Sequence, residues 1–105
     1  MAPVLLELVC RRLAVVADPV RLALLLLLER RGEMCVRDLA DEVELSPQNA
    51  SHHVGVLFRE GLVARRKEGT TVFYELSDFS VCRVVELVRE GVGARIEELG
   101  ELIAE

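Results

Sequence analysis

The chain has 105 residues, of which 51% are hydrophobic, and this is enough for one domain with a core of its own. The formal net charge of -5 excludes a protein that is basic throughout. The longest apolar run, residues 22–28, is far too short to span a membrane. Three scattered cysteines form no disulfide framework, and the first residues lack the basic stretch of a secretory signal. We therefore expect a cytoplasmic protein without a membrane role.

The first third of the chain predicts two helices. Apolar residues recur at helical spacing within residues 1–17, which indicates an amphipathic first helix. Asp18 and Pro19 are a strong start signal for a second helix, because aspartate caps helices and proline suits the first helical position. This helix is expected to end at Gly32. Its five consecutive leucines cannot lie on one stripe, so we expect a central helix that is buried on several sides.

Residues 36–61 predict a helix-turn-helix. A short helix over about residues 36–43 is followed by a turn. Ser46 then supplies a cap and Pro47 the first residue of a second helix, which is expected to end at Gly61. Two short helices joined by a tight turn, the second of them capped, are typical of a DNA-reading unit.

The last part of the chain predicts a hairpin and a long helix. Residues 62–77 alternate with period two on both sides of Gly69, which indicates a β-hairpin, or wing. Asp78 can cap a final helix over residues 79–104, whose apolar residues nearly follow a heptad. The expected fold is therefore mainly α with a small β-hairpin wing, a winged helix-turn-helix in a single domain over residues 1–105.

The first and last helices, in segments 1–17 and 78–105, are expected to mediate homodimerisation. The last helix would be about 40 Å long at ~1.5 Å per residue, which is more than so small a domain can cover. Its seam and the apolar face of the first helix therefore need a second copy. The predicted dimer contacts are Leu5, Leu8, Val9, Val81, Val85, Val88, Val92, Ile96 and Leu99.

The second helix of the helix-turn-helix has an apolar stripe, Ala50, Val54 and Leu57, and an opposite polar stripe. Glutamine can pair with adenine, and arginine and histidine can reach guanine edges or phosphates. The alternative is a polar face that is merely solvated. His53 lies beside the apolar stripe and is expected to be a packed, hydrogen-bonded histidine. The predicted DNA contacts of this helix are Gln48, Asn49, Ser51, His52 and Arg59.

The predicted hairpin carries basic and hydroxyl side chains that suit phosphate contacts or a narrow minor groove. The alternative is a solvated loop that protects an edge strand. Residues 46–71 carry four basic and two acidic side chains, whereas residues 75–105 carry three basic and eight acidic ones. The acidity is therefore mostly C-terminal, away from the predicted DNA-reading unit. The predicted contacts of the hairpin are Arg65, Arg66, Lys67, Thr70 and Thr71.

The stretches "LADPVRLALLLLL", "GEMCVRDLA", "LSPQNASHHVGVLFREGLV" and "RRKEGTTVFYEL" resemble, in this order, the ArsR/SmtB family of winged-helix repressors. The resemblance implies a homodimer packed through its first and last helices. It also implies binding to pseudo-palindromic operators and repression of transcription until an inducer binds. The family's reading positions carry over to Gln48, Ser51 and His52. The chain departs from many members at Gly55, where they have a lysine.

The resemblance also implies a metal or metalloid as the common kind of inducer, but the two common sensing sites of the family are incomplete here. Metalloid sensors carry Cys-Val-Cys-Asp at the start of the third helix, where this chain has Cys35, Val36, Arg37 and Asp38. Of the zinc ligands on the last helix only Asp78 is present, and a helix cap explains it as well. We therefore predict no metal sensing through either site.

Other forms of sensing stay open. Cys10 and Cys35 could meet across the dimer and hold a metal or metalloid ion, or Cys35 could be modified as a thiolate. The third alternative is that each is a small buried hydrophobe. No cofactor is predicted. The residues suggest no enzyme, and the alternative function is a winged-helix protein-interaction module without specific DNA binding.

Overall fold

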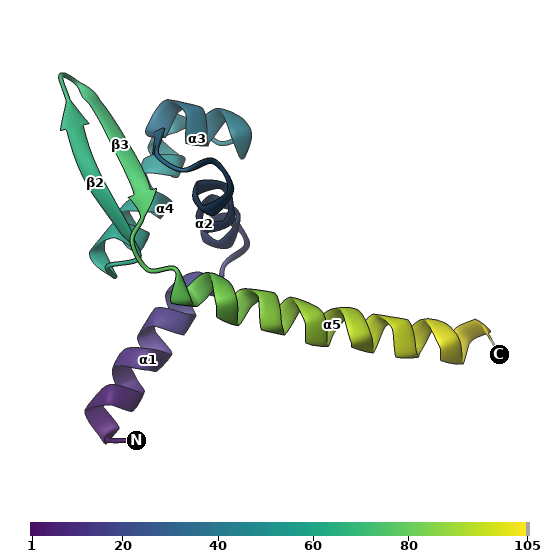
Figure 1. The fold of residues 1–105 in the computed structure, drawn as a ribbon. Coiled ribbons are helices and arrows are strands. Elements are labelled where there is room, and N and C mark those ends of the chain that lie inside the picture. Colours follow the sequence, from purple (N-terminus) through teal and green to yellow (C-terminus); the bar gives the residue numbers. More distant parts are fainter. Residues whose placement is uncertain (105) are drawn as a thin grey trace.

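Figure 1 shows the fold, a computed structural model that describes residues 1–104, with side chains described up to Leu102. The predicted winged helix-turn-helix is confirmed: two short helices are followed directly by a two-stranded wing. Glu105, the predicted end of the second dimerisation segment, lies outside the described residues. The elements in chain order are α1 (Pro3–Val16), α2 (Pro19–Arg31), β1 (Met34–Cys35), α3 (Val36–Glu42), α4 (Pro47–Arg59), β2 (Val63–Glu68), β3 (Thr71–Leu76) and α5 (Ser80–Ala104).

The local signals in the sequence explain where the helices begin and end. The Asp18 carboxylate accepts a hydrogen bond of 2.9 Å from the backbone N–H of Arg21 and so caps α2. The Ser46 hydroxyl oxygen accepts one of 3.1 Å from the N–H of Asn49 and caps α4. Gly32 and Gly61 follow α2 and α4 with φ of +80°, a conformation that glycine adopts without strain. The predicted caps and stops are therefore confirmed.

The sheet contains one strand more than the predicted hairpin. β1 pairs antiparallel with β3, with Met34 opposite Tyr74 and Cys35 opposite Phe73, so the strand order is β1-β3-β2. β2 and β3 form the wing. Their turn lies at residues 69–70, and Thr71 already belongs to β3. β1 ties the root of the wing to the start of α3.

The core is built around α2. Four of its five consecutive leucines are buried, and Leu26 alone among the five is exposed at 39%. The prediction of a helix buried on several sides is therefore confirmed. Leucine and valine side chains of the other elements close around it, and the partners without measurable exposure are Leu39, Val54, Leu57 and Leu62.

The two terminal helices extend away from this core, as Figure 1 shows. The radius of gyration is 16.4 Å, whereas a compact domain of this length has one of about 13 Å. The excess reflects α1 and most of α5, which find little of their own chain to pack against. None of the helices within residues 1–104 has the length and apolar content needed to cross a membrane.

Candidate nucleic-acid interface

The helix-turn-helix presents a polar stripe on α4. Ala50, Val54 and Leu57 have no measurable exposure, so the opposite side of this helix is fixed against the core. The side chains predicted to read DNA are all exposed: Gln48, Asn49, Ser51, His52 and Arg59. A helix that is anchored on one face and polar on the other can enter a groove of DNA as a rigid element.

Gly55 lies beside the Arg59 side chain on the same helix. A Cβ added at Gly55 would lie 3.4 Å from Nη1 of Arg59, which is ordinary van der Waals contact. Where many members of the family have a lysine, the charge nearest to this position is therefore that of the Arg59 guanidinium.

His53 differs from its prediction in one respect. It is half-buried beside the apolar stripe, as expected, and its ring meets that of His52 edge-on at 5.4 Å. Its Nδ1, however, is buried and finds no hydrogen-bond partner among the described residues. The expected hydrogen bond is therefore absent at this nitrogen.

The basic residues of the wing point to two different sides. Adjacent residues of a strand face opposite ways, so Arg65 and Lys67 share one face and Arg66 the other. The guanidinium of Arg65 lies 4.3 Å from the ring centre of Phe58, which joins the wing to α4. Cation–π contacts of this kind leave the guanidinium edge free for other partners.

Arg66 is held by two carboxylates. Its Nη2 lies 2.7 Å from Oε1 of Glu33 and its Nη1 2.8 Å from Oε2 of Glu68, while the guanidinium covers the ring of Phe73 at 4.4 Å. The hydrogen bond from Arg66 lowers the pKa of Glu33. In the protein without DNA, Arg66 therefore fixes the wing to the loop before β1 and is not a free cation.

A groove of about 590 Å³ connects α3, α4 and the wing. Ser51 of α4 and Thr70 and Thr71 of the wing line it, so the structure brings predicted contacts of both elements together. Arg37 and Cys35 line the same groove. Sequence reasoning considered Arg37 only as the loss of a metal ligand. Its position at the start of the first helix of a helix-turn-helix, which usually crosses the DNA backbone, was the available signal.

The three cysteines have different surroundings. Cys10 is exposed, Cys35 half-buried and Cys82 buried. The reading of Cys10 as a small buried hydrophobe is therefore wrong, because α1 has no neighbour over that position in the single chain. Within the described residues of one chain, no three histidine, cysteine, aspartate or glutamate side chains gather into a metal site.

The thiols should differ in reactivity. Burial, together with the carboxylate of Glu29, raises the pKa of Cys82 to about 11, and the thiolate is the reactive form. We expect iodoacetamide at pH 8 to modify Cys10 and Cys35 in the native protein and to reach Cys82 only after unfolding. Mass spectrometry of digested samples follows each site. Modification of native Cys82 at the rate of Cys35 would contradict the buried position.

Asp78 acts as a cap, as predicted, and has a second partner. Its Oδ1 accepts a hydrogen bond of 3.0 Å from the N–H of Ser80 at the start of α5. Its Oδ2 accepts one of 2.9 Å from Arg12 of α1. The hydrogen bonds from Ser80, followed by the charge of Arg12, lower the pKa of Asp78. Arg12 therefore already occupies the carboxylate that matches a metal ligand of the zinc sensors.

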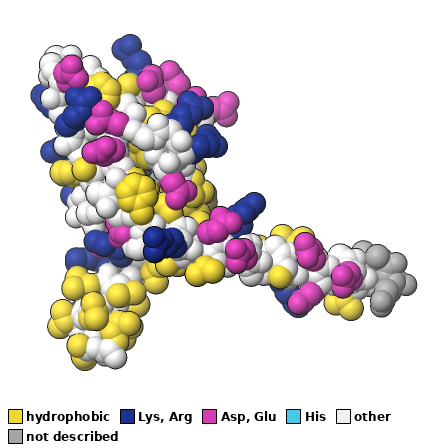
Figure 2. All heavy atoms as spheres, viewed as in Figure 1, with side chains coloured by type: hydrophobic (Ala, Val, Ile, Leu, Met, Phe, Trp, Pro, Cys, Tyr) yellow, Lys and Arg dark blue, Asp and Glu magenta, His cyan; other side chains and the backbone are white. Residues whose placement is uncertain are grey.

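The apolar faces of α1 and α5 are exposed in the single chain. Figure 2 shows hydrophobic side chains over most of the visible surface of α1 and acidic ones along α5. One predicted contact was wrong: Val81 is buried in the core of its own chain at 5% exposure, and Val85 is half-buried against it. The exposed members of the prediction are Leu5, Leu8, Val9, Val88, Val92, Ile96 and Leu99.

Comparisons with known proteins agree with this architecture. The family model for bacterial regulatory proteins of the arsR family matches residues 18–65. An uncharacterised HTH-type transcriptional regulator of Methanocaldococcus jannaschii is 42% identical over 73 residues, which are 70% of this chain and 82% of that protein. The arsenical resistance operon repressor of Escherichia coli is 32% identical over 89 residues, or 85% of this chain and 76% of the repressor.

A solved structure has the same fold. The homodimeric winged helix-turn-helix DNA-binding domain of a possible ArsR-family regulator from Mycobacterium bovis aligns with a TM-score of 0.77 and 32% identity, covering 90% of this chain and 87% of that domain. Neither the relatives nor this structure support a protein-interaction module as the alternative function. The chain belongs to the arsR family of bacterial regulatory proteins, which are DNA-binding transcriptional regulators and not enzymes.

Proposed function

We propose that the chain is a homodimeric repressor that binds a pseudo-palindromic operator and releases it when an inducer binds. The observation that carries this proposal is the exposed polar stripe of α4 on a helix whose other face is fully buried. α4 enters the major groove and the wing lies alongside it. Because the regulator acts on DNA, we also propose a cytoplasmic location.

The proposed DNA contacts fall into two groups, those to bases and those to phosphates. Gln48, Ser51 and His52 face base edges, where bidentate pairing discriminates between bases. Arg65 and Lys67 of the wing, with the hydroxyls of Thr70 and Thr71, face phosphates. Arg59 is a further phosphate contact, and Asn49 lies at the N-terminal end of α4 where bases are read. Arg66 reaches DNA only by exchanging Glu33 and Glu68 for a phosphate.

The distribution of charge allows an acidic chain to bind DNA. Arg37, Arg65 and Lys67 take part in no ion pair among the described residues, so their charges are available to a duplex. The wing and the far end of α5 lie on different sides of the molecule in Figure 1. The acidic side chains of α5 therefore stay away from the bound duplex, where they would otherwise repel it.

The dimer gives the operator its symmetry. Leu5, Leu8 and Val9 of α1, with the α5 stripe from Val88 to Leu99, form the surface that a second copy covers. A two-fold axis through this surface repeats α4, and two repeated helices read two inverted half-sites about one DNA turn apart.

The inducer must favour a dimer in which the two recognition helices no longer fit the operator, since only differential affinity shifts an equilibrium. The two common metal-sensing sites of the family lack ligands in this chain. Cys35 is the better candidate for a thiol-directed inducer, because it lies in the groove beside Ser51 and Thr70. Cys10 is exposed on α1, and a soft ion shared between Cys10 and Cys35 of two copies is the other candidate.

Paired variants test the proposed contacts. Gln48→Ala or His52→Ala should each cost about 1–3 kcal/mol on the preferred duplex and relax its base preference. Lys67→Ala should weaken binding to all sequences alike and reduce the slope of log affinity against log salt by about 1. The preferred duplex is first selected from a random pool by its binding to the protein. Fluorescence anisotropy with this duplex, its single-base variants and a salt series then measures both effects.

The matched control is Arg89→Ala, which removes one positive charge from α5, where Arg89 pairs with Glu86 at the surface. It should leave affinity and salt slope unchanged. Equal effects of Arg89→Ala and Lys67→Ala would contradict the assignment of the wing to DNA.

A further inference from the structure

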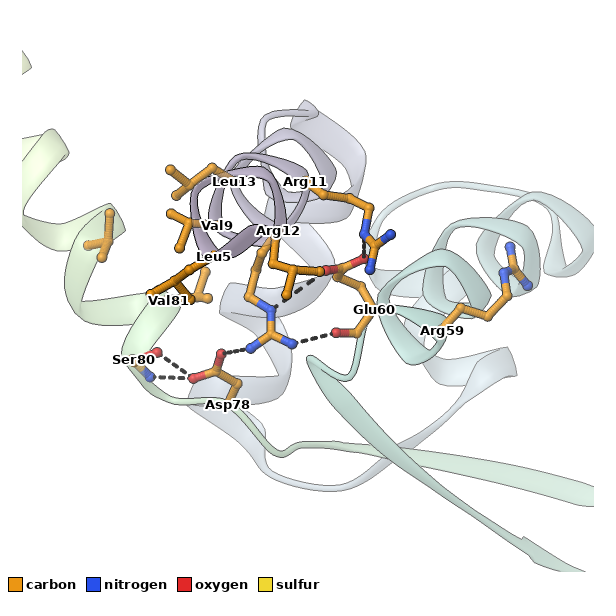
Figure 3. Close-up of a pocket in the computed structure, with 12 residues that line it drawn as sticks. Leu5, Val9, Arg11, Arg12, Leu13, Arg59, Glu60, Asp78, Ser80 and Val81 are labelled. Carbon is orange, nitrogen blue, oxygen red and sulfur yellow. Dashed lines mark hydrogen bonds and ion pairs between the residues drawn. The ribbon is translucent and has the colours of Figure 1, made fainter. Parts of the chain in front are cut away.

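One arginine of α1 joins both dimerisation helices to the end of the recognition helix (Figure 3). Nη1 of Arg12 donates to Oδ2 of Asp78 at 2.9 Å, and Nη2 donates to the backbone carbonyl oxygen of Glu60 at 2.7 Å. Glu60 is the C-terminal cap of α4, and Asp78 caps the first turn of α5. We call these three residues, Arg12, Glu60 and Asp78, the Arg12 junction.

The junction is partly protected from solvent. The side chains of Glu60 and Asp78 are 13% and 18% exposed and that of Arg12 is 41% exposed. Its ion pairs are therefore screened less than those between fully exposed groups. Arg11 adds a contact of 3.3 Å between its Nε and Oε2 of Glu60. Among the described residues, every ion pair between α1 and the rest of the chain ends on Glu60 or Asp78.

Apolar packing within one chain constrains the angle between α1 and α5 only in part. A cavity of about 480 Å³ lies beside the junction, between α1, the end of α4 and the start of α5, and Leu5, Val9 and Val84 line it. No side chain of the same chain fills this space, and Leu5 and Val9 belong to the surface that the proposed second copy covers. A guanidinium is suited to hold that angle, since its planar fork binds two acceptors in fixed directions.

We propose that Arg12 is a positioning residue, which fixes the recognition helix relative to the dimerisation helices and thereby sets the half-site spacing that the dimer recognises. The inference rests on the proposed function, because it needs a dimer that reads two half-sites. The connection is direct: the dimer surface on α1 and α5 sets where the partner lies, and the Arg12 junction sets where α4 lies relative to that surface. A shift at the junction is doubled by the two-fold axis.

The test is binding to a series of duplexes in which two selected half-sites are separated by spacers that differ by one base pair. Each added pair moves one half-site by about 3.4 Å along the axis and by about 35° around it. The wild-type dimer should prefer one spacing sharply. Arg12→Gln should lower the affinity about tenfold at the preferred spacing, which is the size of effect expected when contacts are energetically coupled. At the other spacings it should change the affinity little. The expected result is therefore a flattened spacing profile.

Two further variants distinguish a positioning role of Arg12 from a general effect of its positive charge. Arg12→Lys keeps the charge and the aliphatic stem but loses the planar fork, so it should flatten the profile as well. Arg89→Gln removes a charge from a surface pair of α5 and should keep the wild-type profile. Sedimentation and thermal unfolding at the same concentration test whether each variant is a folded dimer.

A lower melting temperature with the wild-type spacing profile, in both Arg12 variants, would overturn the inference and reduce Arg12 to a stabilising residue. A wild-type protein without any spacing preference would overturn the proposed operator and, with it, this inference. That second result comes from the wild type alone, so the two failures are distinguishable.

Discussion

Replacing Val88 with glutamate is expected to convert the dimer into a monomer at micromolar concentration. Val88 is 59% exposed in the single chain and lies within the apolar stripe of α5. In the dimer, a carboxylate at this position would be buried without a partner, and two-fold symmetry would place two of them in one interface. Loss of bivalent contact should lower operator affinity at least about a hundredfold. Analytical ultracentrifugation and anisotropy titration measure the two effects.

Gly93→Glu is the matched control for this variant. It introduces the same side chain into the same helix, outside the apolar stripe, and a Cβ at Gly93 meets no atom within 4 Å. This variant should stay dimeric and bind the operator normally. A dimeric Val88→Glu protein of unchanged stability would show that α5 does not form the interface.

Leu24→Ala is expected to destabilise the fold by about 2–5 kcal/mol, because removal of a fully enclosed leucine leaves a cavity. Leu24 has no measurable exposure. Leu26, two residues along in the same helix, is exposed at 39%, so Leu26→Ala should cost less than about 1 kcal/mol. Urea unfolding followed by circular dichroism measures the pair at one fixed protein concentration, since the stability of a dimer depends on concentration.

The difference between the two leucine variants is the informative quantity. Both remove the same atoms from the same helix, so helix propensity cancels between them. Equal losses of stability would mean that α2 does not lie at the centre of the core as described.

The boundaries of the elements could be predicted because they depend on neighbouring residues. Asp18 and Ser46 cap α2 and α4 through hydrogen bonds to the backbone three residues later, and Gly32 and Gly61 end the helices by their backbone conformation. The polar stripe of α4 was predictable for a related reason. Helical periodicity determines which residues share a face, so Ala50 and Gln48 were correctly placed on opposite sides.

The remaining features depend on contacts between distant parts of the chain. β1 has two residues and hence no periodicity from which a strand could be recognised. Arg66 looked like a free cation in the sequence, but its main partner, Glu33, lies 33 residues away. Val81 follows the heptad of α5, yet the part of that seam nearest the core is covered by the chain itself. A helical wheel shows which residues share a face and cannot show what covers it.

Binding of DNA by a sequence-specific dimer is the property from which the other predictions follow. The most direct test is selection of bound duplexes from a random pool, followed by titration of the selected duplex and a scrambled one at several salt concentrations. We expect an inverted repeat bound by two chains, an affinity at least about a thousandfold above that for the scrambled duplex, and a steep loss of affinity with salt. Equal affinity for both duplexes, or binding indifferent to salt, would contradict it.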